Sequence, residues 1–105
     1  MRAYLIPAQS PHGGFDMRDD LDQLNLLQAL VGGYIEPCAP AQLREWGIEL
    51  LANEEGLLQG LPFNINMYPF FFVGDLVAVG VKGEEFVSLT PEQEHYLKDW
   101  LNDLT

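Results

Sequence analysis

The sequence has little positive charge. Five Lys and Arg stand against sixteen Asp and Glu, so the formal net charge is −11. Nucleic acid and anionic lipid have the same sign of charge and are repelled by such a chain. We therefore expect no direct binding to nucleic acid and none to a membrane. Basic protein surfaces are attracted instead, although a purely solubilising role for the acidity stays open.

Cysteine is almost absent as well, and long apolar runs are missing. Cys38 is the only cysteine, which excludes an internal disulfide and is typical of a reducing compartment. Its neighbours include no base or cation that lowers a thiol pKa, so we predict a structural, partly buried thiol. No segment approaches the roughly 20 apolar residues of a membrane span, and the first residues do not resemble a signal peptide. We expect a cytoplasmic protein.

Catalytic and metal-binding patterns are also missing. His12 and His95 lie far apart, and neither has a second ligand at metal spacing. No serine lies in a nucleophile elbow, and the paired carboxylates lie at expected turns or helix starts, where water solvates them. We therefore predict no catalytic residues, no cofactor and no metal. His12 stays open as a member of a binding loop.

What the chain does have is the pattern of a globular α+β domain. Hydrophobic residues make up 48% of it, and at 105 residues we expect a single domain spanning 1–105. Apolar residues recur at helical spacing through 21–31, with Asp19 or Asp20 as the cap. Gly32 and Gly33 follow this helix, whereas the glycines of a phosphate loop precede one. They are therefore predicted to end the helix.

The second half of the chain predicts strands and a final helix. Residues 74–81 are mostly apolar, which favours a central strand, and 47–64 suggest two strands joined by a tight turn at 53–56. Thr90, Pro91 and Gln93 match the capping box of a helix start. The predicted fold is a mostly antiparallel sheet with two helices packed on one face.

Residues 61–74, LPFNINMYPFFFVG, are unusually aromatic. A strand alternates its side chains between two faces, so three consecutive Phe cannot all face one core. We expect most of the segment to be buried but at least one of Phe70, Phe71 and Phe72 to be exposed. Exposed aromatic patches mark binding surfaces. Self-association into a homodimer through this segment is intermediate between burial in the core and exposure to another partner.

Four motifs resemble a known family: LQALVGGYIE (27–36), NEEGLLQGLPFN (53–64), GDLVAVG (74–80) and SLTPEQ (88–93). The chain is similar to a family of small domains of unknown function from bacteriophages, plasmids and other mobile elements. The family has no established catalytic residues, so none is implied here. The resemblance implies an accessory protein, and such proteins often inhibit host defence. INMYPFFF (65–72) departs from the pattern and puts a shared binding role of that segment in doubt.

Three functions remain open. The leading hypothesis is a non-enzymatic inhibitor that binds a basic surface of a defence protein, such as a CRISPR or restriction nuclease. Its contacts would come from the acidic turns and the exposed aromatics, namely Asp19, Asp20, Glu54, Glu55, Glu84, Glu85, Phe70, Phe71 and Phe72. The alternative is a homo-oligomer that sequesters a small molecule such as a signalling nucleotide, in a pocket lined by Phe63 and Tyr68. A weak carboxylate enzyme is the third.

Overall fold

The computed structural model describes residues 1–18, 22–67 and 70–104, except for the side chain of Phe70. A sheet in the order β2-β1-β7-β4-β3 forms its centre, and β8 pairs with the end of β7. Every pairing is antiparallel. The strands are β1 (Arg2–Ile6), β2 (Gly13–Asp16), β3 (Ile35–Pro37), β4 (Ile48–Asn53), β7 (Leu76–Lys82) and β8 (Glu85–Val87).

The remaining elements are one separate hairpin and three helices. Strands β5 (Phe63–Met67) and β6 (Phe70–Val73) pair only with each other in the described part of the chain. The helices are α1 (Gln23–Val31), α2 (Ala41–Arg44) and α3 (Pro91–Asp103). The predicted α+β class and mostly antiparallel sheet are confirmed. The predicted hairpin over 47–64 is wrong, because turns follow β4 and the next strand pairs with β6 instead.

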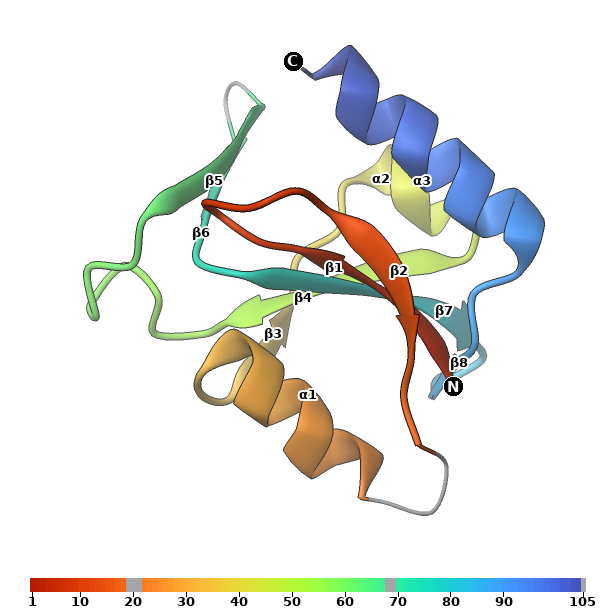
Figure 1. The fold of residues 1–105 in the computed structure, drawn as a ribbon, viewed down its shortest axis with the longest axis horizontal. Coiled ribbons are helices and arrows are strands. Elements are labelled where there is room, and N and C mark those ends of the chain that lie inside the picture. Colours follow the sequence, from red (N-terminus) through yellow and green to blue (C-terminus); the bar gives the residue numbers. More distant parts are fainter. Residues whose placement is uncertain (19–21, 68–69, 105) are drawn as a thin grey trace.

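The two longer helices cover opposite faces of the sheet (Figure 1), so the prediction of both helices on one face is wrong. The central strands cause this. Leu50 belongs to the core under α3, and its neighbour Leu51 belongs to the core under α1; Val77 and Ala78 divide in the same way. A sheet that is apolar on both faces needs cover on both.

Local signals define the ends of α1 largely as predicted. Gly32 has φ of +81° and donates its N–H to the carbonyl of Gln28, so it ends the helix. The N-terminal cap is Asp22, whose carboxylate accepts hydrogen bonds from the N–H groups of Leu24 and Asn25. The prediction of Asp19 or Asp20 as the cap is therefore wrong, and these two residues lie outside the described residues.

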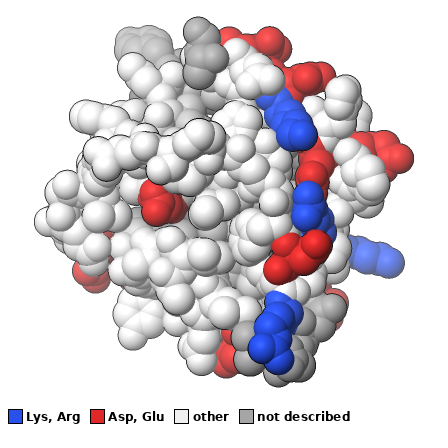
Figure 2. Space-filling model, viewed as in Figure 1, with Lys and Arg blue, Asp and Glu red and all other residues white. Residues whose placement is uncertain are grey.

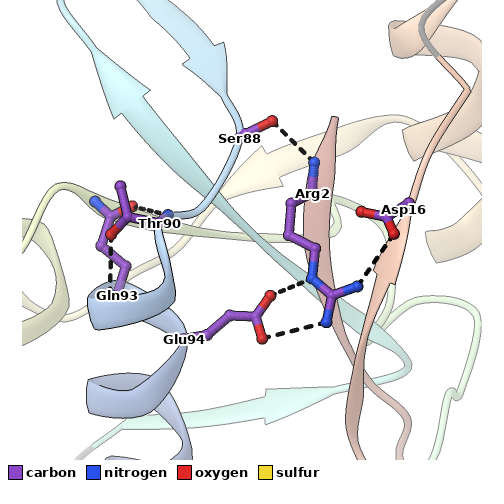
Figure 3. Close-up of polar contacts among 6 residues, drawn as sticks. All are labelled: Arg2, Asp16, Ser88, Thr90, Gln93 and Glu94. Atoms are coloured by element: carbon purple, nitrogen blue, oxygen red, sulfur yellow. Dashed lines mark hydrogen bonds and ion pairs between the residues drawn. The ribbon is translucent and has the colours of Figure 1, made fainter.

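Helix α3 begins at the predicted capping box and is tied to the sheet by Arg2 (Figure 3). The side chain of Gln93 accepts from the N–H of Thr90, and the hydroxyl of Thr90 accepts from the N–H of Gln93. The guanidinium of Arg2 bonds to Glu94 on α3 and to Asp16 on β2. One cation thus joins β1, β2 and α3, and it is held by two carboxylates.

Candidate binding surface at one end of the sheet

Asn53, the last residue of β4, organises the turns that follow it. Its buried side chain donates to the carbonyl of Val31 at 3.3 Å and to Gln59 Oε1 at 3.0 Å, and accepts from the N–H of Glu55 at 2.9 Å. The N–H of Glu54 donates to the carbonyl of Tyr34. The motifs 27–36 and 53–64 therefore meet in space, and their contact holds the loop in place.

This loop turns outward instead of returning along the sheet. Backbone hydrogen bonds within residues 53–61 close it, including Leu61 N to Gly56 O at 3.0 Å. Gly56 has no room for a side chain, because a Cβ there would lie 2.8 Å from a methyl group of Val73. The loop thus packs against β6 at Gly56 and projects Leu57 and Leu58 into solvent.

The β5–β6 hairpin is anchored beside the loop by Asn64. Its side-chain amide donates at 2.7 Å both to the carbonyl of Ile6 and to that of Gly74. Gly74 in turn donates its N–H to Pro62 O at 2.7 Å and has φ of +76°. These bonds place the hairpin and the loop after β4 at the same end of the molecule, on the left in Figure 1.

Loop and hairpin together expose four large apolar side chains, which we call the Phe71 patch. Their exposed fractions are 67% for Leu57, 88% for Leu58, 70% for Phe63 and 48% for Phe71. The rings of Phe63 and Phe71 meet edge to face with centroids 5.6 Å apart. Leu57, Leu58 and Phe71 also line one pocket of about 440 Å³. Contiguous exposed apolar groups of this kind are typical of a binding surface.

Carboxylates border the patch. Glu36 from β3 and Glu54 from the loop line the same pocket, and Glu55 lines a neighbouring one of about 350 Å³. Among the described residues, no Lys or Arg lines either pocket. In Figure 2 the cations on the visible face lie among carboxylates along the right-hand margin, away from the end that carries the loop and hairpin. The patch is therefore apolar at its centre and negative at its edge.

Comparison with known protein families places nearly the whole chain in one family. The family model described as Domain of unknown function (DUF3846) matches residues 1–102. The chain belongs to the DUF3846 family. No curated protein and no solved structure matches this DUF3846 chain.

Only some of the predicted site residues of this DUF3846 domain come together. Glu54 lies beside Phe71 and Phe72 in one pocket, and Glu55 is its neighbour. Of the three phenylalanines, Phe71 is exposed as expected, whereas Phe72 packs partly buried against the core. The expectation that most of 61–74 is buried is wrong, because Ile65 alone is buried among its described side chains. The predictions for Asp19, Asp20, Tyr68 and the side chain of Phe70 lie outside the described residues.

Glu84 and Glu85 do not join this surface. They lie at the turn between β7 and β8, and β7 runs antiparallel to β4. The end of β7 is therefore beside the start of β4, as the hydrogen bond from Val81 N to Gly47 O shows. The predicted acidic turns consequently lie at opposite ends of the sheet and not on one continuous surface.

Sequence reasoning missed Leu57, Leu58 and the anchoring asparagines. The prediction of two strands over 47–64 places this pair of leucines in a strand, although glycines flank the pair at positions 56 and 60. Gly60 has φ of +69°, a backbone conformation that favours a turn. An apolar pair between two glycines, without alternation, was the available signal.

Cys38 lines the pocket of the Phe71 patch. Burial, with smaller contributions from Glu49 and Glu36, raises the pKa of this thiol to about 12. No group of three or more His, Cys, Asp or Glu suited to hold a metal ion occurs in the described ranges. His12 is tied to the core, because its Nδ1 lies 2.6 Å from the hydroxyl of buried Tyr4.

In the part of the chain that is described, no helix has the length and apolar character needed to cross a membrane.

Cys38 is expected to react slowly with a thiol reagent at pH 8. A rise in pKa from 9.0 to about 12 makes the thiolate fraction roughly 1,000-fold smaller than that of a free thiol. Since the folded pKa is the higher one, the free energy of unfolding should also fall as pH rises above 9. The rate at which the reagent labels Cys38 is measured in buffer, where the protein is folded, and in urea, where it is unfolded. Equal labelling rates in the two would contradict the raised pKa.

Proposed function

We propose that this DUF3846 domain is a non-enzymatic accessory protein of a bacteriophage or other mobile element. In this proposal it acts in the host cytoplasm and inhibits a CRISPR-type or restriction-type defence system by binding a basic surface of a defence protein. The observation that carries the proposal is the Phe71 patch with its border of Glu36, Glu54 and Glu55. Exposed aromatic and aliphatic anchors supply affinity when a partner desolvates them.

The charge of the patch supports a basic partner. Nucleases hold nucleic acid on surfaces rich in Lys and Arg, which complement a carboxylate border and a net charge of −11. Complementary charge speeds association, and salt screens it. Binding through this patch is therefore expected to weaken as ionic strength rises, while the apolar centre retains part of the affinity.

Two pairs of substitutions test the patch against a purified defence nuclease that the wild-type domain inhibits. Leu57→Ser with Leu58→Ser, and separately Glu36→Gln with Glu54→Gln, are each expected to weaken binding by about 30-fold, the scale of an interface hot spot. Calorimetry at low and high salt gives the affinities. Plating efficiency of phage on a host that carries the defence system gives the activity.

Glu84→Gln with Glu85→Gln is the matched control. It changes the net charge as much as the Glu36 and Glu54 pair but acts at the other end of the sheet, so both readouts should stay near wild type. If both glutamate pairs weaken binding equally, charge alone acts and the patch is not the site. If no nuclease of a defended host binds the wild-type domain or is inhibited by it, the proposed function is wrong.

The pocket beside Phe71 favours one alternative, a small-molecule-binding homo-oligomer. Its volume of about 440 Å³ is within the range of small-molecule sites. Glu36 and Glu54 repel an anionic nucleotide, so the pocket suits a neutral or cationic ligand better. Size-exclusion chromatography with light scattering separates the proposals. A monomer that enters a larger complex with host lysate at low salt favours the inhibitor, and a salt-resistant oligomer that ignores the lysate favours the alternative.

A further inference from the structure

A second exposed aromatic site lies at the opposite end of β4 from the Phe71 patch. Trp46, just before β4, stacks on Tyr96 of α3 with ring centroids 4.2 Å apart and 12° between the planes. Tyr96 packs against the core and covers one face of the indole. Trp46 is nevertheless 46% exposed, so its other face is open to solvent.

The stacked pair is held rigidly by the capping box of α3. Gln93, shown with Thr90 in Figure 3, uses its amide oxygen to accept from the N–H of Thr90. Its amide nitrogen donates to the carbonyl of Trp46 at 2.8 Å and to that of Gly47 at 3.2 Å. The backbone that carries the indole is therefore bonded to the start of α3, and the aromatic platform exists before any ligand binds.

The platform is the floor of an open pocket of about 440 Å³. Glu92, His95, Tyr96 and Asp99 all line it, because they follow one another at helical spacing on one face of α3. Two carboxylates thus flank the indole, and Asp99 lies 3.4 Å from His95. In the described residues, no Lys or Arg lines this pocket.

We propose that this Trp46 pocket binds an arginine side chain of a basic peptide segment in a partner protein. A guanidinium is planar, stacks on the face of an indole by cation–π attraction and donates several N–H groups to nearby carboxylates. Lysine has no planar group to stack in this way. Phosphate, nucleic acid and acidic peptides are repelled by Glu92 and Asp99.

The pocket is separate from the Phe71 patch and does not rest on the proposed function. Gly47 precedes the first residue of β4 and Asn53 is its last, and a strand of six residues spans about 20 Å. A single arginine cannot contact both surfaces. Substitutions at one end can therefore be tested without altering the other.

The test uses short synthetic peptides in which arginine alternates with glycine, with lysine and citrulline versions for comparison. Citrulline keeps the shape of arginine without its charge. We expect calorimetry to show that the arginine peptide binds tightest and that Trp46→Ala weakens it by about 10-fold. Trp46→Phe, which keeps an aromatic face, should weaken binding of the arginine peptide less than Trp46→Ala does. In a Trp100→Phe background, the remaining indole should change its fluorescence on binding.

Paired carboxylate substitutions locate the site. Glu92→Gln with Asp99→Asn is expected to weaken binding by a similar factor, whereas Glu84→Gln with Glu85→Gln removes equal charge outside the pocket and should have little effect. Equal losses in the two pairs would overturn the proposal, because attraction would then be nonspecific. Unchanged affinity in both Trp46 variants would also overturn it, as would equal binding of the lysine or citrulline peptide.

Discussion

Replacing Leu50 or Leu51 with alanine is expected to lower the free energy of unfolding by about 3 kcal/mol in each case. The two side chains are adjacent in β4 and point to opposite faces, yet both are fully buried. Each deletion removes apolar contact and leaves a cavity in a different core, one under α3 and the other under α1. Urea denaturation of the two variants measures the loss.

Leu58→Ala is the control for this pair, because Leu58 is the same residue type in an exposed position. It should change the free energy of unfolding by less than about 0.5 kcal/mol. A fold with both helices on one face would leave either Leu50 or Leu51 near water. A small cost for one of the two would therefore contradict the two-sided core.

Asn53→Ala is expected to cost about 3 kcal/mol of the free energy of unfolding. The change leaves the carbonyl of Val31 and the N–H of Glu55 without their side-chain partner, and removes the bond to Gln59. Because these bonds hold the loop after β4, hydrogen exchange should quicken in residues 54–61 more than in α3. Thermal or urea unfolding gives the global cost.

Asn66→Ala provides the matched comparison, since Asn66 is an exposed asparagine of the β5–β6 hairpin. Asn66→Ala should leave the free energy of unfolding almost unchanged. Equal effects of the two substitutions would mean that Asn53 does not organise the loop. Because Leu57 and Leu58 lie in this loop, Asn53→Ala should also weaken binding at the Phe71 patch while it leaves the Trp46 pocket unchanged. This outcome separates the two surfaces by a single substitution.

The candidate site was predictable only in part. Clusters of Phe and of Glu are visible in the sequence, and the alternation of a strand predicted that at least one of Phe70, Phe71 and Phe72 is exposed, without saying which. Their grouping was not visible. Glu54 joins Phe71 because turns follow β4 and the hairpin folds beside them, whereas Glu85 is carried to the other end by the antiparallel course of β7. Charge clusters in sequence do not reveal which strand ends are neighbours.

Features that depend on a few consecutive residues were predictable from the order of amino acids. Gly32 ends α1, the capping box at Thr90 starts α3, and the apolar run of β7 places that strand inside the sheet. Packing between distant segments sets which face each helix covers, exposes Leu58 to solvent and stacks Trp46 on Tyr96. The difference arises from the range of the interactions. Caps, turns and periodicity depend on residues that are close in the sequence, whereas the two surfaces form from segments joined only by packing and hydrogen bonds across the sheet.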